Sequence, residues 1–182
     1  MTTQPSYADA LGVVGLVSSG LASGLTLAYP LLVNRHFQWK QGAHIQPASD
    51  AANLSLAQRL TLWNHSYDVG HWCPLFAFGA ALGLTGSCLA SSGDWSDWNK
   101  RLLVAASVTH VSIAPFTVLV IAPVNDRLMA LRKLANAGKT DLVSEDEADS
   151  LMARWGSLHN VRVVLSLAGF VTAAAVAVTY PN

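Results

Sequence analysis

The 182-residue chain is poor in charged residues. Asp, Glu, Lys and Arg make up 12% of it, whereas soluble domains carry about 25%. Hydrophobic residues make up 52% of the chain, and the mean hydropathy is +0.35. This composition argues against a soluble globular domain and indicates a membrane protein. The 11 basic and 11 acidic residues balance to a net charge of zero, so the chain lacks the basic patch that a nucleic-acid partner would require.

The chain also has little cysteine. Its two cysteines, Cys73 and Cys88, fall on one predicted helix and would stand roughly 22 Å apart at 1.5 Å per residue. That separation is too large for a disulfide bond within the chain. We interpret both as small buried apolar residues.

Long apolar stretches are what the chain does have. Four of them cover about residues 8–33, 68–90, 102–124 and 156–179, and each approaches or exceeds the roughly 20 residues needed to cross a bilayer. The first lacks a basic segment before it and is too long for a signal peptide, so we expect it to be a retained helix. With their polar extensions, the predicted helices span about 8–33, 58–91, 98–134 and 145–179. They predict an all-α fold, an antiparallel four-helix transmembrane bundle in a single membrane domain over residues 1–182.

Basic residues predict the orientation of this multi-pass protein. They flank the first and third connections, whereas only Lys100 and Arg101 mark the second. The positive-inside rule then places the first and third connections in the cytoplasm and both termini on the non-cytoplasmic side. The first helix also carries Gly20 and Gly24, a step of small residues that predicts a close approach by a neighbouring helix.

Polar residues within the predicted spans are the candidate functional residues, because polar groups are costly inside a bilayer. On the second helix, Asn64, Asp68 and His71 recur at helical spacing. Trp63 and Tyr67 form an adjacent stripe there, and on the fourth helix Trp155, His159 and Arg162 share a face. The cytoplasmic half of the predicted bundle contains Asp68, His71, His159 and Arg162, together with Asn125 and Arg127 of the third helix, so we expect one polar cluster there. The alternative is structural, with an Asp68–Arg162 or Asp126–Arg154 ion pair holding the helices together.

Short motifs in the second half of the chain carry a resemblance. Residues Ala114 to Leu128 read APFTVLVIAPVNDRL, and residues Arg154 to Arg162 read RWGSLHNVR. At these motifs, and at Trp63, Tyr67, Gly70 and Pro74, the chain resembles a family of small integral membrane proteins that includes the fungal anthrone oxygenases. The order and spacing of the motifs carry the likeness over nearly the whole chain.

The resemblance implies that the chain oxidises a polyketide anthrone to an anthraquinone with dioxygen, in secondary metabolism. An anthrone is a flat apolar phenol whose central methylene is acidic, and its anion can pass an electron to dioxygen without a cofactor. Such a reaction needs a base, a cation beside the oxyanion and an apolar slot. We expect catalytic roles for His159, Arg162, Asp68 and His71. We expect substrate binding by Trp63, Tyr67, Phe116, Thr117, Asn125 and Trp155. Spacing does not choose between His159 and the Asp68–His71 pair as the base.

Two other interpretations stay open. His71, His110 and His159 stand on three predicted helices and could hold haem, copper or iron in a metal-dependent oxidase of another small molecule. The chain could instead be a non-catalytic scaffold or accessory protein of a biosynthetic pathway. The expected partners are a small aromatic substrate and the lipid bilayer, and the sequence carries no signal for an oligomeric state.

Overall fold

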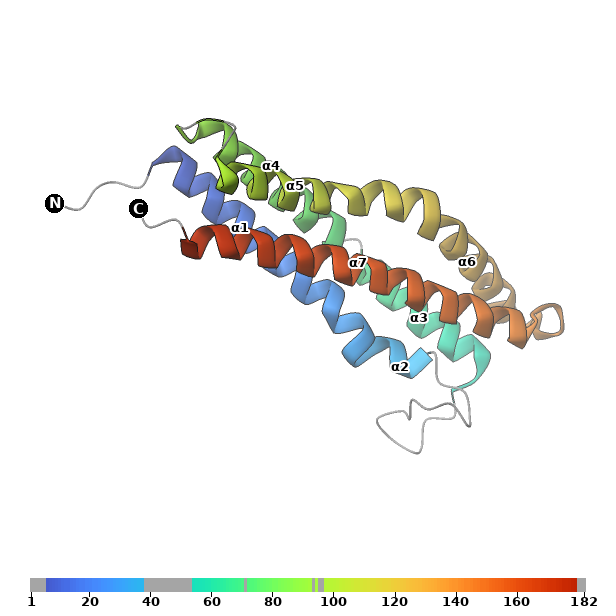
Figure 1. Cartoon of the computed structure of the whole chain (residues 1–182). Helices are drawn as coiled ribbons and strands as arrows, with labels where there is room; N and C mark the ends of the chain where they lie inside the picture. Colours follow the sequence, from blue (N-terminus) through green and yellow to red (C-terminus); the bar gives the residue numbers. More distant parts are fainter. Residues whose placement is uncertain (1–5, 38–53, 71, 93, 95–96, 180–182) are drawn as a thin grey trace. The chain divides into compact units, whose positions relative to one another are not determined.

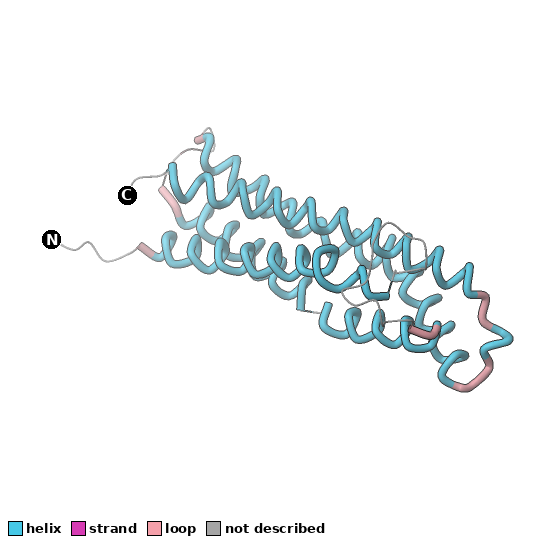
Figure 2. The backbone as a smooth tube through the Cα atoms, turned by 90° about the horizontal axis from the view of Figure 1, so that it is seen from below, coloured by secondary structure: helices cyan, strands magenta, loops and turns pink. Residues whose placement is uncertain are grey.

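The structure is a computed structural model that describes residues 6–37, 54–70, 72–92, 94 and 97–179. Over these residues the regular structure is helical, joined by short loops and turns (Figure 2). The α-helices are α1 (Tyr7–Ala28), α2 (Asn34–Phe37), α3 (Leu56–Gly70), α4 (Trp72–Ala90), α5 (Trp98–Phe116), α6 (Ala122–Asn136) and α7 (Glu145–Thr179), drawn in Figure 1. The predicted all-α fold class is confirmed.

Four helical runs are long and apolar enough to cross a membrane: Tyr7–Val33, Leu56–Ala90, Trp98–Asn136 and Glu145–Thr179. Large apolar side chains project outward from them, among them Val13, Leu82, Leu119 and Val178. Because an exposed apolar surface of this extent suits lipid better than water, the runs are those of a multi-pass membrane protein with a four-helix bundle fold.

The chain divides into two compact units, described separately here. The first unit contains the described residues within 1–26, 72–115 and 162–182, and the second contains those within 27–71 and 116–161. Each unit therefore receives a segment from each of the four helical runs.

Proline occurs near two of the places where the chain passes from one unit to the other. A π-helical segment, Tyr29–Val33, follows α1 and contains Pro30, and a second, Thr117–Ile121, lies between Pro115 and Pro123. Proline donates no backbone hydrogen bond, and π-helical segments arise where the normal ladder of a helix is interrupted. In contrast, α7 continues through residues 161 and 162 without a break.

A glycine contact brings α1 and α4 together in the first unit. A Cβ atom built on Gly83 would lie 2.5 Å from the backbone nitrogen of Gly15, so neither position has room for a side chain. We predicted that a neighbouring helix approaches closely at Gly20 and Gly24, but the close approach occurs at Gly15 instead. Gly24 is exposed with no described atom within 4 Å of a built Cβ, and a Cβ on Gly20 would meet only the ring of Phe170 at 3.4 Å.

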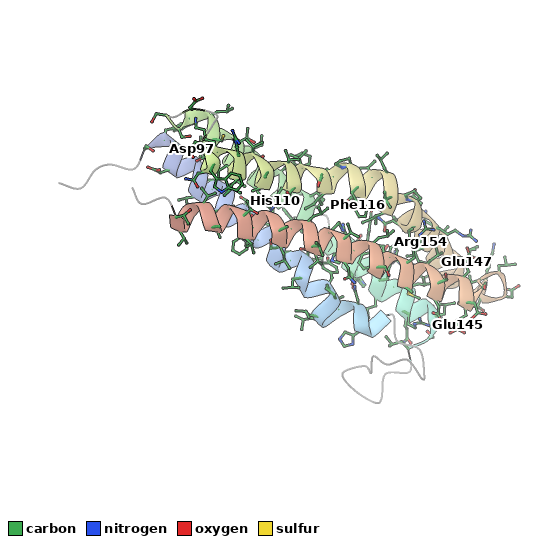
Figure 3. All side chains as sticks on the ribbon, in the orientation of Figure 1. Asp97, His110, Phe116, Glu145, Glu147 and Arg154 are labelled. Carbon is green, nitrogen blue, oxygen red and sulfur yellow. The ribbon has the colours of Figure 1, made fainter. Side chains whose placement is uncertain are left out.

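His110 supplies the main polar link inside the first unit. It is 1% exposed, and its Nδ1 lies 2.8 Å from the carbonyl oxygen of Ala106. A carbonyl only accepts hydrogen bonds, so Nδ1 carries the proton and Nε2 accepts from the Ser19 hydroxyl at 2.9 Å. A Cβ on Gly169 would lie 2.2 Å from the His110 ring. His110, labelled on α5 in Figure 3, thus connects α5 to α1 and packs against α7.

The contact between Gly15 and Gly83 predicts a sharp difference between two glycine substitutions. Gly83→Ala should destabilise the folded protein by about 1–3 kcal/mol, because the new methyl group overlaps backbone that cannot move aside easily. Gly24→Ala should leave stability unchanged or slightly raised, because its methyl group enters open space. Thermal unfolding of both variants in the same detergent measures the difference, and equal melting temperatures would contradict this packing.

Candidate functional site

The second unit holds most of the residues that the sequence singled out. It contains Trp63, Tyr67 and Asp68 on α3, Phe116 at the end of α5, Thr117 in the following π-helical segment, Asn125 on α6, and Trp155 and His159 on α7. Arg162 and His110 belong to the first unit, where both are buried. His71 lies outside the described residues.

Aromatic rings from three segments pack against one another in the second unit. The His159 imidazole stacks on the Trp155 indole with centroids 5.2 Å apart and planes 19° from parallel. Tyr29 lies 4.8 Å from His159 between ring centroids, and Trp63 meets Trp155 edge to face at 6.2 Å. Tyr67 stacks on Trp63 at 5.8 Å. We call these five residues the aromatic cluster; edge-to-face and offset stacked pairs are favourable ring geometries.

Helical spacing explains how α3 and α7 supply two rings each. Trp63 and Tyr67 are four residues apart on α3, and so are Trp155 and His159 on α7. Residues four apart share one face of an α-helix, so each pair presents adjoining rings in one direction. The sequence correctly grouped Trp155 with His159 and Trp63 with Tyr67.

Tyr29 is the member of the cluster to which the sequence assigned no role. It is 5% exposed, and its hydroxyl donates a 2.7 Å hydrogen bond to the carbonyl oxygen of Ser66 on α3. A Cβ on Gly70 would approach that hydroxyl to 3.3 Å. A tyrosine at the end of an apolar stretch usually indicates an anchor at the membrane interface. The proline that follows it, Pro30, was the sequence signal that the backbone here departs from a regular α-helix.

Burial removes the centre of the cluster from solvent and lipid. Trp63, Trp155 and His159 are 0%, 2% and 1% exposed. Because Trp63 packs on Trp155 and Trp155 on His159, the rings fill the space between α3 and α7. A flat substrate would therefore lie beside these rings or displace one of them, rather than fill an existing gap between them.

Several buried side-chain atoms of the second unit have no hydrogen-bond partner among the described residues, among them atoms of Asn34 and Arg132. Two of them belong to residues that the sequence singled out: the indole nitrogen of Trp63 and the amide oxygen Oδ1 of Asn125. A buried donor or acceptor left unpaired costs about 1–3 kcal/mol, and such atoms in a folded protein call for an explanation. The Trp63 atom is a donor, and the Asn125 atom is an acceptor.

Asp68 differs in its surroundings from the buried cluster. It is exposed, and its Oδ2 accepts a 2.8 Å hydrogen bond from the side-chain amide of Asn64. The predicted stripe of Asn64 and Asp68 on α3 thus exists as a direct contact. Phe116, the last residue of α5, and Thr117, the first residue of the π-helical segment, are both half-buried.

Ion pairs join α7 to α3 and α6 at the far end of the second unit. The buried guanidinium of Arg59 on α3 donates to Asp149, and it also lies 3.6 Å from Glu145. Arg127 on α6 forms two hydrogen bonds to Glu147, 2.6 and 2.9 Å long. Figure 3 labels Glu145 and Glu147 in the first turn of α7. The Arg59 pair is buried and costly to break, whereas the exposed Arg127 pair contributes little.

A metal-dependent oxidase would use His71, His110 and His159 as its metal ligands. Both ring nitrogens of His110 are engaged, one by Ser19 and one by Ala106, so this residue has no nitrogen left for a metal. Among the described residues, no group of three His, Cys, Asp or Glu side chains is placed to hold a metal ion.

Comparison with known proteins places the chain in a family. The anthrone oxygenase family profile matches residues 63–172. The anthrone oxygenase tpcL of Aspergillus fumigatus is 34% identical over 118 residues, which cover 63% of this chain and 68% of that protein. The anthrone oxygenase dmxR16 of a Cryptosporiopsis species is 28% identical over 126 residues, covering 64% of this chain and 63% of that protein. The anthrone oxygenase ptaC of Pestalotiopsis fici is 36% identical over 73 residues, covering 40% and 52%.

The chain belongs to the anthrone oxygenase family. The matched region begins at Trp63 and includes Trp155 and His159, so four of the five rings of the aromatic cluster lie within it. The chain spans between about half and two thirds of the length of these three relatives. No solved structure matches it.

Proposed function

We propose that this chain is a membrane-embedded oxygenase that oxidises a polyketide anthrone to an anthraquinone with dioxygen. Membership of the anthrone oxygenase family supports the reaction. The observation in the structure that carries the proposal is the buried aromatic cluster, which combines flat apolar surfaces, an imidazole and an unpaired indole N–H group. These are the groups that binding and deprotonating a flat phenolic ketone requires.

The reaction follows from the acidity of the substrate. A base removes a proton from the central methylene, and the negative charge moves onto the carbonyl oxygen opposite, which makes the central ring aromatic. This anion passes an electron to dioxygen, and recombination gives a hydroperoxide at the former methylene carbon. Loss of water then leaves the second carbonyl. One dioxygen supplies one oxygen atom to the quinone and one to water, so the step balances without a metal or an organic cofactor.

His159 is the base in this proposal. Its imidazole is buried and held between Tyr29 and Trp155, and an imidazole accepts protons near neutral pH. Aromatic neighbours exclude water from the anion, which otherwise would be reprotonated before it met dioxygen. Asp68 and His71 are the other candidate base from the sequence. The exposed position of Asp68 favours His159.

Trp63 supplies the hydrogen bond to the oxyanion in this proposal. The carbonyl oxygen of an anthrone accepts more strongly once the methylene has lost its proton, so an N–H group aimed at it stabilises the anion more than the neutral substrate. The unpaired N–H group of Trp63 suits that task, and Asn125 Oδ1 can accept from a phenolic hydroxyl. Arg162 stays a predicted second partner for the oxyanion, and Phe116 and Thr117 stay predicted substrate contacts.

The bilayer is part of the proposed function. An anthrone partitions into apolar surroundings, and the outward faces of the helices are apolar. We propose that the substrate reaches the enzyme from the membrane, with both termini of the chain on the non-cytoplasmic side, as the distribution of basic residues predicts.

Replacing His159 tests the proposed base. His159→Gln should lower the rate of anthrone oxidation by at least about 100-fold, the usual contribution of a general base. His65→Gln is the matched control, because His65 is exposed on α3 and should keep the wild-type rate. The readouts are anthraquinone absorbance and dioxygen uptake by protein shown to be folded in detergent. A normally folded His159→Gln protein with the wild-type rate would reject this site and favour a scaffold role.

Replacing Trp63 tests the proposed oxyanion donor separately. Trp63→Phe keeps an aromatic ring but removes the N–H group. It should lower kcat by about 100-fold with little change in KM, because the lost hydrogen bond acts mainly in the transition state. Trp98→Phe is the control, since Trp98 is 67% exposed on α5. A rise in KM with kcat unchanged would mean that Trp63 only helps to bind the substrate.

A further inference from the structure

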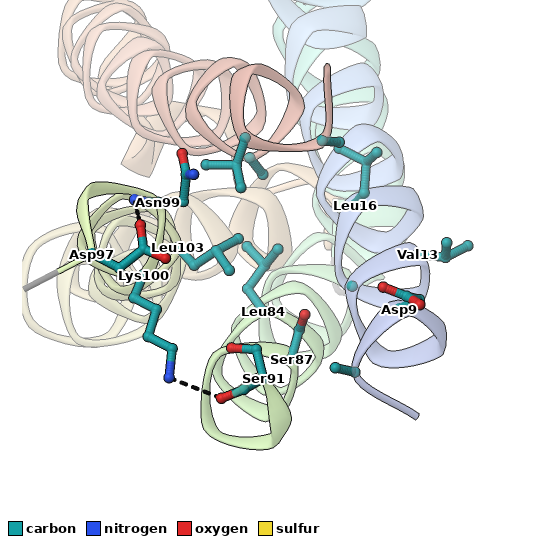
Figure 4. Close-up of a pocket in the computed structure, with 15 residues that line it drawn as sticks. Asp9, Val13, Leu16, Leu84, Ser87, Ser91, Asp97, Asn99, Lys100 and Leu103 are labelled. Carbon is teal, nitrogen blue, oxygen red and sulfur yellow. Dashed lines mark hydrogen bonds between the residues drawn. The ribbon is translucent and has the colours of Figure 1, made fainter. Parts of the chain in front are cut away.

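The first unit contains a cavity with a volume of about 260 Å³. It lies among α1, α4, α5 and α7, at the end of the unit where α1 and α5 begin and α4 and α7 end (Figure 4). None of the residues of the aromatic cluster lines it. Neither the family match nor the proposed reaction assigns it a role.

The inner walls of the cavity are apolar. Leu16, Leu84, Leu103, Ala173 and Val176 line it, and Leu84 and Ala173 belong to the buried core of the first unit. An apolar cavity of about 150 Å³ holds one benzene ring, so this cavity has room for about two fused rings. A third ring could extend toward the polar end.

The polar residues of the cavity lie toward the helix ends. They are Asp9, Ser87, Ser91, Asp97, Asn99 and Lys100, labelled in Figure 4. Hydrogen bonds hold the two carboxylates in place: Asp9 accepts from the backbone N–H of Ser6 at 2.9 Å, and Asp97 accepts from the backbone N–H of Asn99 at 2.9 Å. A carboxylate accepts several hydrogen bonds at once, so both keep capacity for a ligand.

The charges select among ligands that could donate to these carboxylates. Lys100 also lines the cavity and is only 7% exposed, with its ammonium group 2.9 Å from the carbonyl oxygen of Ser91. A cationic ligand would be attracted by the two carboxylates and repelled by Lys100, and it would lose its hydration on entering a cavity with apolar walls. A neutral hydroxyl group can donate to Asp9 or Asp97 without that desolvation penalty, and the fused rings behind it would fill the apolar end.

We propose that this cavity is a second binding site, for a fused-ring phenol. The rings occupy the apolar end, and the hydroxyl group donates to Asp9 or Asp97. The assignment to the phenolic substrate or product of this enzyme rests on the proposed function, whereas the size and polarity of the cavity do not depend on it.

A simple two-ring phenol tests the site. The full chain, in lipid nanodiscs, is titrated with 2-naphthol, whose fluorescence reports binding. Ala177→Phe fills the cavity from α7 and should weaken binding by at least about tenfold, since the added ring takes the space of the ligand. Ala175→Phe is the matched control. Ala175 is also an exposed alanine on α7, but it does not line the cavity, so this variant should bind 2-naphthol as tightly as the wild-type protein does.

Two further measurements keep the proposal falsifiable. The double variant Asp9→Asn with Asp97→Asn, which fills no space, should weaken 2-naphthol binding while leaving naphthalene binding unchanged, because a charged acceptor forms the stronger hydrogen bond. Equal affinity of wild type for naphthalene and 2-naphthol would point to an apolar occupant such as an acyl chain and would overturn the proposal. So would equal 2-naphthol affinity in Ala177→Phe and Ala175→Phe. A protein that oxidises no anthrone but shows the expected binding differences would reject the proposed function alone.

Discussion

The stacking of His159 on Trp155 is the contact on which the proposed site in the second unit depends. One helix carries both residues four positions apart, so their relative placement follows from helix geometry alone. Tyr29 and Trp63 then enclose the pair from other segments. The arrangement keeps an imidazole among apolar rings, where a carbanion could form without meeting water. It also leaves the Trp63 N–H group unpaired within the described protein, a cost that a bound ketone would offset.

Both units bury polar groups, some paired and some unpaired among the described residues. In the first unit both nitrogens of His110 have protein partners, and the glycines at 15 and 83 allow backbone to meet backbone. The buried hydroxyl of Ser166 in the same unit nevertheless has no hydrogen-bond partner among the described residues. The second unit keeps the unpaired atoms of Trp63 and Asn125. Unpaired atoms therefore occur in both units, and the candidate site is assigned to the second unit because the aromatic cluster lies there.

Helical periodicity and hydropathy were enough to predict the all-α fold and the pairing of Trp155 with His159. They could not predict contacts between segments far apart in sequence. The close approach of α1 to α4 occurs at Gly15 rather than at Gly20 and Gly24, because a stripe of small residues does not reveal which of its members faces a neighbour. Likewise, Tyr29 joins the cluster through packing and a hydrogen bond to Ser66, which no local pattern encodes. Nor did any local pattern predict the ion pairs of Arg59 with Asp149 and of Arg127 with Glu147.

The central claim is that the substrate anion itself reduces dioxygen beside His159 and Trp63. The most direct test is a visible absorption spectrum, together with metal analysis, of detergent-purified protein while it oxidises an anthrone under air. The account predicts a colourless, metal-free preparation that consumes one dioxygen for each anthraquinone formed. A haem absorption band, or copper or iron in stoichiometric amount that is required for activity, would contradict it and make a metal centre the site of oxidation.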